Sequence, residues 1–500
     1  MVSGKSIYEV KSQPQSVSLP DSKRRFSVLF VSPECAPFAT SGGLGEVAGS
    51  LPQALKRRRK SSIDCRVIMP LYSSVDPKYR DRMNFIGTSS VPVSWRNQYM
   101  GLFKLKLHGV IYYFIDNEQY FNRKGLYGYY DDCERFAYFS MAVFKAIDLI
   151  DDFSPDIIHA NDWQTALVPV YQNSLFRREY TKTVFTIHNI EYQGQYGNDV
   201  LEDLIGLPES ENPILMFGED VNLMKGGIES ANACTTVSAS YAEELQSPEN
   251  AFGLDSIIRR NSHKIYGILN GIDTVKYNPE RDPSIEANYS ASDLSGKLLC
   301  KKALQRTLGL PEEDVPLITM VSRLVPAKGI DLVREIMDSM LSDNDVQFAI
   351  LGTGYMEYED YFKWLQAKHA NKAAALIKFD PILSHLMYAG GDILLVPSRS
   401  EPCGITQMIG CRYANIPVVR ATGGLKDSIS DCTLGNGSGF VFENFDPGSL
   451  YAAIIRALNL YSSRQDWAKL CAYDMRLNFG WSNSAEEYRK IYEDLLSAKI

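Results

Sequence analysis

Short apolar runs alternate with longer amphipathic stretches along this chain, and the alternation occurs in two series. The first series of predicted strands covers residues 26–31, 65–70, 110–115, 156–159, 183–187, 233–237 and 264–269. The second covers residues 317–321, 347–351, 393–396 and 418–420. Strands that alternate with helices predict a parallel sheet wrapped by helices. Two series in 500 residues predict two domains, because single cores stop growing at about 250–300 residues.

The segment 279–295 is polar, carries two prolines and separates the two series. The predicted organisation, in chain order, is a mobile tail over 1–25, an N-terminal domain over 26–280, a hinge region over 281–296, a C-terminal domain over 297–480 and a closing helix within 481–500. The first 25 residues lack an apolar segment, which argues against a secretory signal or a membrane anchor. No window reaches the about 18 apolar residues that a membrane span needs.

A carboxylate, Glu401, stands just past the predicted strand 393–396. Ligands of open α/β sheets bind at the carboxyl ends of the strands. Pro402 and Gly404 predict a tight turn, and an amphipathic run to Tyr413 begins directly after it. The free N–H groups at the start of such a helix favour an anion such as a diphosphate. An acidic N-cap among ordinary turn residues is the alternative interpretation.

Two cations, Arg323 and Lys328, follow the predicted strand 317–321. They suit a diphosphate whose negative charge grows as a bond to it breaks. The alternative is a pair of solvated surface charges, which is the usual state of Arg and Lys.

Glycine-rich turns follow a strand in both series. Gly42 and Gly43 come after the strand 26–31 and lead into a predicted helix over 47–55. A second turn over 422–427 comes after the apolar run 416–419. Glycine permits a ligand to approach the backbone closely. One such turn in each of the two series suggests two nucleotide-type domains that face each other.

The composition excludes several classes of protein. The net charge of −8 argues against a strongly electrostatic nucleic-acid or membrane binder. The nine cysteines are odd in number and contain no Cys-x-x-Cys pair, which is typical of a reduced intracellular chain without a disulfide framework or a zinc site. We find no metal-binding triad, dinucleotide fingerprint or P-loop in the sequence.

A set of markers makes nearly the whole chain, from about residue 26 to the last helix, similar to the bacterial glycogen synthase and plant starch synthase family. The markers occur in the family's order and are the turn at 42–44, residues 127–128 with 134–136, 159–163, 185–189 with 192–194, 269–273, the pair Arg323 and Lys328, residues 398–399 with 401–404, and 422–425. A chance match to all of them is excluded in practice.

This resemblance implies a retaining glucosyltransferase that extends an α-1,4-glucan or a maltooligosaccharide from a sugar nucleotide, usually ADP-glucose. It implies the glycosyltransferase B fold, in which two Rossmann-like domains surround a deep cleft and the last helix crosses back onto the first domain. It implies no cofactor beyond the nucleotide-sugar substrate. The bacterial cytoplasm is the expected compartment and a plastid is the alternative. Whether the protein forms a homo-oligomer is left open by the sequence.

The resemblance also implies roles at five catalytic positions. His188 contacts the transferred glucose, Asp162 shapes the glucose and acceptor pocket, and Glu401 hydrogen-bonds glucose hydroxyls. Arg323 and Lys328 neutralise the departing diphosphate. Two plainer interpretations apply, because an isolated histidine is commonly a satisfied core residue and an aspartate that opens a helix is commonly its N-cap.

Further positions are implied to bind the substrates. Phe379 aligns with an aromatic residue that stacks on adenine, and Trp163 could stack on a sugar ring of the acceptor. The donor-binding residues are Gly42, Gly43, Asn270, Phe379, Cys403, Gly404, Ile405 and Thr406. The acceptor-binding residues are Trp163 and Asn189. No metal ligand is expected.

The expected mechanism is a front-side transfer. A retaining glycosidase would hold two carboxylates about 5–5.5 Å apart, and the sequence offers no convincing partner for Glu401. The resemblance implies instead that the diphosphate leaves, the sugar becomes oxocarbenium-like, and the acceptor 4-hydroxyl attacks the same face. A leaving phosphate oxygen takes the proton. Domain closure would exclude water, which otherwise hydrolyses the donor.

Several positions depart from the family pattern. Thr40 and Ser41 stand where the family usually has Lys-Thr, so one cation near the diphosphate is missing. The preference between ADP-glucose and UDP-glucose is therefore open. The other departures are Glu46 for Asp, Ala327 for Gln, Leu386 for Arg and Ser400 for Phe.

Two alternative functions remain beside a glucan synthase. One is a related enzyme of the same fold with UDP-glucose or a small sugar acceptor, such as a sucrose- or trehalose-type synthase. The other is a non-catalytic glucan-binding homologue, which the presence of His188, Lys328 and Glu401 disfavours. Elongation of maltooligosaccharide, formation of a disaccharide, and binding without turnover would distinguish the three.

Overall fold

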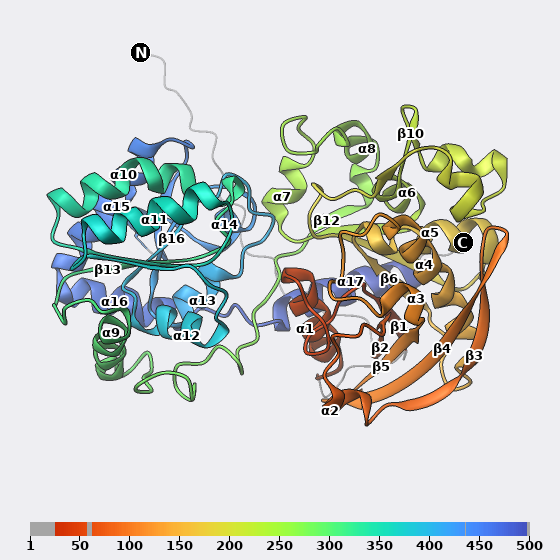
Figure 1. Ribbon diagram of the computed structural model, residues 1–500, viewed down its shortest axis with the longest axis horizontal. Coiled ribbons are helices and arrows are strands. Elements are labelled where there is room, and N and C mark those ends of the chain that lie inside the picture. The colour runs from red at the N-terminus through yellow and green to blue at the C-terminus, as the bar shows by residue number, and fades with distance from the viewer. Residues whose placement is uncertain (1–25, 58–62, 436, 498–500) are drawn as a thin grey trace, which may run out of the picture.

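The computed structural model describes residues 26–57, 63–435 and 437–497. Two sheets, each flanked by helices, lie side by side, and two segments of the chain run between them (Figure 1). The predicted mobile tail over 1–25 lies outside the described residues. No helix within those residues has the combination of length and apolarity that crossing a membrane requires.

The first sheet has nine strands in the order β12-β11-β7-β6-β1-β2-β5-β4-β3. All neighbouring pairs are parallel except β3 with β4 and β4 with β5. The bounds of its strands are β1 (Phe26–Val31), β2 (Ile63–Pro70), β3 (Asn84–Val93), β4 (Arg96–Leu107), β5 (Val110–Asp116), β6 (Ile157–Asn161), β7 (Lys182–Ile187), β11 (Ala233–Thr236) and β12 (Ile265–Gly267).

The second sheet has six parallel strands in the order β15-β14-β13-β16-β17-β18. Its strands are β13 (Leu317–Val321), β14 (Gln347–Leu351), β15 (Ala373–Leu376), β16 (Ile393–Val396), β17 (Ile416–Arg420) and β18 (Phe440–Phe442). A small third sheet contains β8 (Gln195–Tyr196), β9 (Met216–Phe217) and β10 (Asp220–Asn222).

Helices connect the strands and cover the sheets (Figure 1). Those of the first part of the chain are α1 (Gly43–Arg57), α2 (Pro77–Arg80), α3 (Glu118–Phe121), α4 (Asp132–Leu149), α5 (Leu167–Tyr171), α6 (Leu223–Ser230), α7 (Ala239–Glu244) and α8 (Asp255–Arg260). The later ones are α9 (Ser295–Leu308), α10 (Ile330–Asp343), α11 (Met356–Lys368), α12 (Pro381–Gly390), α13 (Thr406–Arg412), α14 (Gly423–Ser428), α15 (Pro447–Ser462), α16 (Arg464–Asp474) and α17 (Ser482–Ser497).

The apolar runs of the sequence form the central strands because helices cover both faces of each sheet. Every residue of β6, β14 and β16 is buried. A parallel sheet covered on both faces needs such continuous apolar strands. The sequence therefore located the strands well where they are central.

Two elements differ from the expectation. The long antiparallel hairpin of β3 and β4 was not predicted, because its strands carry many exposed polar residues. The amphipathic run 164–176, which lies between two predicted strands and is therefore expected to be one helix, is broken into a 3₁₀ turn (Trp163–Thr165), α5 and a π-turn (Gln172–Phe176). Pro169 lies within α5, and proline supplies no N–H to the helical ladder.

The chain crosses between the sheets twice, at neighbouring positions. The backbone N–H of Ile272 donates to the carbonyl of Phe479 at 2.8 Å. Helix α17 follows the second crossing and lies on the first sheet, where the Tyr492 hydroxyl and His159 Nδ1 are 2.7 Å apart. Within the expected hinge region, Asp282 accepts a hydrogen bond from the hydroxyl of Tyr413 on the second domain at 2.6 Å. The predicted domain boundaries themselves stay a prediction.

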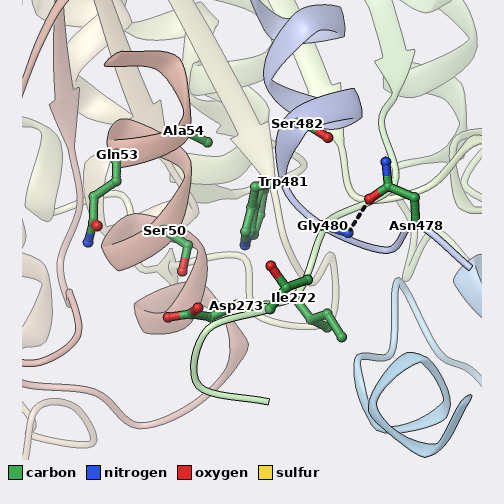
Figure 2. Close-up of a pocket in the computed structure, with 10 residues that line it drawn as sticks. Ser50, Gln53, Ala54, Ile272, Asp273, Asn478, Gly480, Trp481 and Ser482 are labelled. Carbon is green, nitrogen blue, oxygen red and sulfur yellow. Dashed lines mark hydrogen bonds between the residues drawn. The ribbon is translucent and has the colours of Figure 1, made fainter. Parts of the chain in front are cut away.

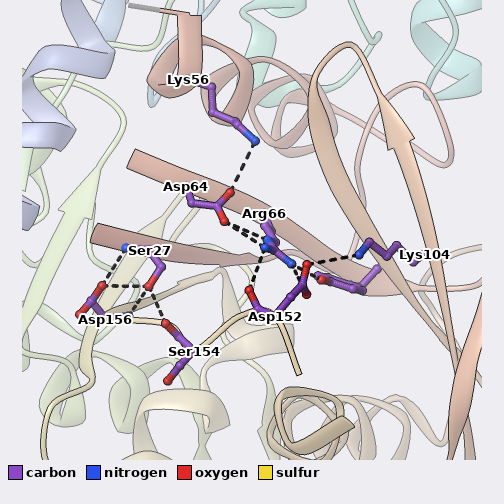
Figure 3. A network of polar contacts seen from close by, with 9 residues as sticks. Ser27, Lys56, Asp64, Arg66, Lys104, Asp152, Ser154 and Asp156 are labelled. Carbon is purple, nitrogen blue, oxygen red and sulfur yellow. Dashed lines mark hydrogen bonds and ion pairs between the residues drawn. The ribbon is translucent and has the colours of Figure 1, made fainter. Parts of the chain in front are cut away.

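A polar network closes the amino-terminal edge of the first sheet (Figure 3). Arg66 is buried and donates to Asp152 Oδ1 at 2.8 Å, to Asp64 Oδ2 at 3.1 Å through Nε, and to the Tyr113 hydroxyl at 2.6 Å. These groups lie in the first halves of β2 and β5 and in the segment before β6, away from the carboxyl ends of the strands, where ligands of such sheets bind.

Candidate active site

Lys328 and Glu401 meet at the carboxyl ends of two neighbouring strands. Strands β13 and β16 are parallel partners in the second sheet. The turns that follow them are joined by a hydrogen bond from the Arg399 N–H to the Ala327 carbonyl at 2.9 Å. Lys328 Nζ lies 2.5 Å from Glu401 Oε2. The sheet order therefore turns two separate sequence signals into one charged pair.

The Glu401 side chain is held by one oxygen and leaves the other available. Glu401 is 8% exposed, and its Oε2 accepts from Ser398 Oγ at 2.9 Å as well as from Lys328. Its Oε1 has no partner among the described residues. Glu401 does not cap α13, which begins at Thr406 without a side-chain cap, so the N-cap interpretation is wrong. The free oxygen can accept a hydrogen bond from a ligand hydroxyl.

The second cation has no protein partner. Arg323 is exposed, and no ion pair or hydrogen bond of its side chain occurs among the described residues. Lys328 is fixed by a tight turn that ends at Gly329, whose φ is +70°. A Cβ at Gly329 would lie 2.0 Å from the Pro397 carbonyl oxygen, so only glycine lets the turn pack there. One fixed and one free cation thus lie beside the same strand end.

Four predicted donor-binding residues lie in the loop before α13 and at the first position of that helix: Cys403, Gly404, Ile405 and Thr406. Gly404 has φ +68°, a conformation that favours glycine. Burial raises the pKa of the Cys403 thiol to about 12, so Cys403 is not a thiolate nucleophile at neutral pH. Asn270 lies beside Cys403 and is buried, and its Oδ1 lacks a partner among the described residues. That oxygen is an unsatisfied buried acceptor beside the Cys403 loop.

The two glycine-rich turns differ in what surrounds them. A Cβ added at Gly42 or at Gly43 would meet nothing within 4 Å, so this turn faces open space. A Cβ at Gly423 would lie 2.1 Å from the Glu401 carbonyl oxygen, and one at Gly424 would lie 2.0 Å from the Cys403 carbonyl oxygen. The first turn can therefore receive a ligand, whereas the second supports the Glu401 loop by close packing.

A carboxylate that the sequence analysis missed organises the first turn. Glu34 is 1% exposed, and its Oε2 accepts from Ser41 N at 2.8 Å and from Ser41 Oγ at 2.5 Å. Its Oε1 accepts from Gly45 N at 2.7 Å, and the Tyr127 hydroxyl donates to Oε2 at 3.2 Å. Its position three residues past the buried strand β1 was the available signal. Glu34 thus holds the turn of Gly42 and Gly43 in shape.

Substitution Glu34→Ala should weaken donor binding. The N–H groups of Ser41 and of the buried Gly45 would lose their acceptor, and the turn would rearrange. We expect the KM for the nucleotide sugar to rise about tenfold or more, corresponding to ~1.4 kcal/mol, while the KM for maltooligosaccharide changes less. Initial-rate kinetics with each substrate varied separately would measure this, and equal changes in both KM values would contradict the assignment.

Asp162 and His188 meet at the carboxyl ends of β6 and β7, which are parallel neighbours. Asp162 has φ +55°, and its Oδ1 accepts from the backbone N–H groups of His188 at 2.7 Å and Asn189 at 3.4 Å. It makes no cap bond to the turn that it precedes, so the N-cap interpretation is wrong here too. Asp162 instead locks the backbone that carries His188.

The imidazole of His188 is neutral and oriented. Burial lowers its pKa to about 3. Its Nε2 lies 2.9 Å from Asn161 Oδ1, and the amide of Asn161 donates to the Val31 carbonyl, which fixes the amide orientation. Nε2 therefore carries the proton, and Nδ1 is an acceptor with no protein partner among the described residues. Such a nitrogen can accept a hydrogen bond from a sugar hydroxyl.

The half-buried Asp162 carboxyl should make stability depend on pH. Burial raises its pKa from 3.8 to about 7, so the folded state holds its proton more tightly than the unfolded state. This contribution to stability is complete below pH 3.8 and is lost as the pH rises through about 7. The Asp162→Asn variant should therefore gain about 1–2 kcal/mol relative to the wild type between pH 5 and pH 8. Denaturant unfolding of both proteins at pH 5 and at pH 8 would measure the difference in their free energies of unfolding. A difference that is the same at both pH values would contradict the prediction.

An aromatic pocket of about 440 Å³ opens beside these residues. Trp163 forms one wall, packed edge-on against Phe136 with ring centroids 5.4 Å apart. Gly194 approaches this ring so closely that a Cβ would lie 2.6 Å from Trp163 Cε3. The lining residues are Trp163, Glu191, Tyr192, Gln193, Gly194, Gln195, Tyr196 and Phe252. Of the aromatic residues that line this pocket, only Trp163 was predicted from the sequence to be a site residue.

The remaining predicted residues lie at the edges of the site. Phe379 is 88% exposed, next to Asp380, which caps α12. Such an exposed phenyl ring suits stacking on a flat ligand. Asn189 follows His188, and its Oδ1 accepts from the Glu191 N–H at 3.0 Å. No hydrogen bond among the described residues joins the Asp162 group to the Lys328 and Glu401 pair, so the site has two halves.

Contacts between the domains bring the Glu401 loop against the first domain. Ser238 Oγ donates to the Pro402 carbonyl at 2.6 Å. Ser240 N donates to Asp427 Oδ2 at 2.8 Å, and Gly423 N donates to Glu244 Oε1 at 2.8 Å. Helix α7 of the first domain is thereby joined to α14 of the second.

Comparison with known proteins gives concordant matches. The family described as "Starch synthase catalytic domain" matches residues 27–260, and "Glycosyl transferases group 1" matches residues 302–470. Glycogen synthase of Clostridium botulinum (strain Alaska E43 / Type E3) is 44% identical over 478 residues, which cover 94% of this chain and 99% of that protein. Glycogen synthase of Geobacillus stearothermophilus is 44% identical over 478 residues, 94% of this chain and 98% of that one.

Solved structures agree with these matches. The catalytic domain of Starch Synthase IV from Arabidopsis thaliana, bound to ADP and acarbose, superposes with a TM-score of 0.87 at 34% identity. The match covers 95% of this chain and 100% of that one. Sucrose-phosphate synthase from Thermosynechococcus elongatus gives a TM-score of 0.59 at 16% identity, a likeness of fold alone.

The matched domains and the parallel sheets define the class of the protein, a glycosyltransferase of the B fold with two Rossmann-like domains, as predicted. The chain belongs to the glycogen synthase and starch synthase family. It is accordingly a hexosyltransferase of the ADP-glucose type that uses a nucleotide-sugar donor and a glucan acceptor.

Proposed function

We propose that this enzyme transfers glucose from ADP-glucose to the non-reducing 4-hydroxyl of an α-1,4-glucan, with retention of configuration, at the edge where Lys328 and Glu401 meet. The observation that carries the proposal is this charged pair, together with Arg323 on the same turn, whose side chain has no partner among the described residues. A sugar diphosphate needs cations for its leaving group and an acceptor for its hydroxyls. The two side chains and Arg323 supply both within one loop cluster.

The donor lies across the second domain in this proposal. Arg323 and Lys328 bind the diphosphate, and the open turn of Gly42 and Gly43 faces it from the first domain. The N–H groups of Ile405 and Thr406 add donors, and Asn270 Oδ1 accepts a hydrogen bond. Phe379 stacks on the base. The ADP that is bound to the plant relative supports a nucleotide diphosphate as the ligand. No cofactor beyond this substrate is proposed.

The chemistry follows from what each group can do. As the glycosidic carbon–oxygen bond breaks, negative charge grows on the diphosphate, and Arg323 and Lys328 stabilise it. Glu401 Oε1 and His188 Nδ1 accept hydrogen bonds from glucose hydroxyls and hold the ring. The acceptor 4-hydroxyl attacks the face that the diphosphate leaves, and its proton passes to the leaving phosphate oxygen. The products are ADP and a glucan longer by one residue.

The acceptor lies against the first domain. The aromatic pocket beside Trp163 is next to Asp162 in the chain and offers rings together with the amides of Gln193 and Gln195. Sugar rings present apolar faces between hydroxyl rims, which suits such a lining. The acarbose that is bound to the plant relative is consistent with an oligosaccharide ligand. Asn189 completes the acceptor side in this proposal.

Substitution Tyr192→Ala should weaken acceptor binding. Tyr192 is 54% exposed in the lining of the aromatic pocket, so its removal costs little folding energy. We expect the KM for maltotetraose to rise about tenfold, corresponding to ~1.4 kcal/mol, with the KM for ADP-glucose unchanged. Tyr180→Ala, at an exposed tyrosine outside the pocket, is the matched control. An unchanged acceptor KM in Tyr192→Ala would remove the pocket from acceptor binding.

The proposed donor is tested by competition. The protein would be incubated with maltotetraose and an equal mixture of differently labelled ADP-glucose and UDP-glucose. The proposal expects elongation chiefly from ADP-glucose. A product built chiefly from UDP-glucose would favour the alternative donor, and a disaccharide product would favour a small-acceptor enzyme. Thr40→Lys with Ser41→Thr tests whether the missing cation limits donor affinity, and a lower donor KM is expected.

The proposal also covers the cellular compartment and the oligomeric state of the enzyme. The similar bacterial glycogen synthases support action in the bacterial cytoplasm, and a plastid is the alternative. Cell fractionation with activity staining would separate the two. A homo-oligomer is compatible with the proposal and would be detected by light scattering.

A further inference from the structure

A second cavity lies at the crossing of the two domains. Its volume is about 290 Å³, and its walls come from α1, from residues 272–274 of the first crossing and from residues 478–482 of the second. Figure 2 shows Trp481 standing between α1 and the second crossing, with Asp273 and Ile272 at its lower end. None of the residues assigned to donor or acceptor binding lines this cavity.

The lining has the chemistry of a site for a neutral polyhydroxyl compound. Its polar residues are Ser50, Gln53, Asp273, Thr274, Asn478, Trp481 and Ser482, and no lysine, arginine or histidine lines it. An anion such as a nucleotide is therefore disfavoured. One carboxylate, two amides and three hydroxyls beside an indole can exchange hydrogen bonds with a sugar whose apolar face meets the ring.

Several of these groups are unused by the protein. Asp273 Oδ1 accepts from Val275 N at 2.8 Å and from Lys276 N at 3.1 Å, whereas its Oδ2 has no partner among the described residues. Asn478 Oδ1 accepts from Gly480 N at 3.2 Å (Figure 2), and its Nδ2 has no partner within the described ranges. Trp481 is 8% exposed, and no hydrogen bond of its Nε1 occurs in the described part of the chain. The residues that line the cavity therefore carry an unpaired acceptor and unpaired donors among the described residues.

The size and the position of the cavity limit its occupant. Its volume is at the low end of the about 300–1,000 Å³ range of small-molecule pockets. It rests on the two crossings, which are joined through the Ile272 N–H and the Phe479 carbonyl. A Cβ at Gly271 would lie 2.7 Å from Trp481 N, so the backbones of the two crossings are in close contact at this point. An occupant would touch both segments that connect the two domains.

We propose that this cavity, here called the crossing site, binds one or two rings of a neutral sugar, and that its occupancy biases the opening of the catalytic cleft. A ligand that contacts both crossings binds one arrangement of the domains better than the other, and it shifts the populations by that difference. The sugar ring could belong to a free oligosaccharide or to a chain end of the glucan. This inference goes beyond the proposed reaction, since the crossing site is separate from the cleft.

Fluorine NMR of protein labelled with 5-fluorotryptophan tests the proposal without turnover. The chain has five tryptophans, and single Trp→Phe substitutions assign their signals. Titration with maltotriose, without donor, should shift the Trp481 signal. The shift should persist in Trp163→Ala, in which the acceptor pocket of the cleft is impaired. It should be lost in Ala54→Leu, because the larger side chain fills the crossing site from α1.

Matched variants keep the test decisive. Ala303→Leu makes the same change at a half-buried position of α9 and should keep the Trp481 shift. Ser50→Leu replaces Ala54→Leu if that variant does not fold. Sorbitol, a polyol without a ring, should have no effect. A shift with glycogen but not with free maltotriose identifies the chain end as the ligand.

Three results would overturn the proposal. A Trp481 signal that neither maltotriose nor glycogen moves would exclude the crossing site. A shift that disappears in Trp163→Ala would show that the signal only reports binding in the cleft. A shift that survives both Ala54→Leu and Ser50→Leu would place the sugar elsewhere. Each outcome is independent of whether the enzyme prefers ADP-glucose.

Discussion

The Lys328→Ala variant should remain folded while its kcat falls about 10²–10³-fold, corresponding to ~3–4 kcal/mol of lost transition-state stabilisation. Lys328 is a cation whose position is fixed by the turn before Gly329 and by Glu401. The charge of a departing diphosphate is largest in the transition state, so the loss should appear in kcat more than in KM. Steady-state kinetics with ADP-glucose and maltotetraose would measure it.

A matched lysine provides the control for this result. Lys363 is half exposed on α11 and pairs with Asp360 at 3.0 Å, so Lys363→Ala also breaks an ion pair. That variant should keep normal turnover. Circular dichroism should show both variants folded, because Glu401 keeps its bond from Ser398 Oγ after Lys328 is removed. Near-normal turnover of Lys328→Ala would remove Lys328 from the mechanism.

The Glu401→Ala variant should lose activity by a similar factor, for two physical reasons. The glucose hydroxyl that donates a hydrogen bond to Oε1 would lose its acceptor. Lys328 would lose the carboxylate that positions its ammonium group. Both effects act on the same reacting sugar diphosphate. We expect kcat to fall about 10²–10³-fold, and Glu401→Gln to restore only part of the loss because an amide cannot hold Lys328 by charge.

Coupling between the two residues distinguishes positioning from independent action. Because Glu401 holds Lys328, the double variant Lys328→Ala with Glu401→Ala should lose less than the product of the single losses. Glu357→Ala, which breaks a surface pair with Arg334, is the carboxylate control and should be neutral. Full additivity of the double variant would mean that the ion pair has no part in the reaction.

The sequence predicted the second half of the site because its residues follow apolar strands. Lys328 and Glu401 each come shortly after a run that could only be a buried strand, and the carboxyl ends of parallel strands share one edge. Their direct contact could not be predicted, because it depends on β13 and β16 being neighbours although β14 and β15 come between them in the chain. Sheet order is set by packing of the whole domain rather than by local pattern.

The first half of the site was harder to predict. Asp162 follows a strand and precedes a turn, a pattern typical of a helix cap, and only the pairing of β6 with β7 directs its carboxylate to the His188 backbone. Glu34 lies in an irregular loop, where no periodicity marks a buried carboxylate. Tyr192 and Phe252 line the same pocket from distant parts of the chain. Long-range packing decides all of these contacts.

A crystal structure of the enzyme with bound ADP would test the central claim most directly, namely that the second domain carries the cations that receive the diphosphate. The account predicts that the Arg323 guanidinium and the Lys328 ammonium lie within hydrogen-bond distance of the phosphate oxygens, with the Gly42 turn opposite them. Both side chains directed into solvent, away from the nucleotide, would contradict it.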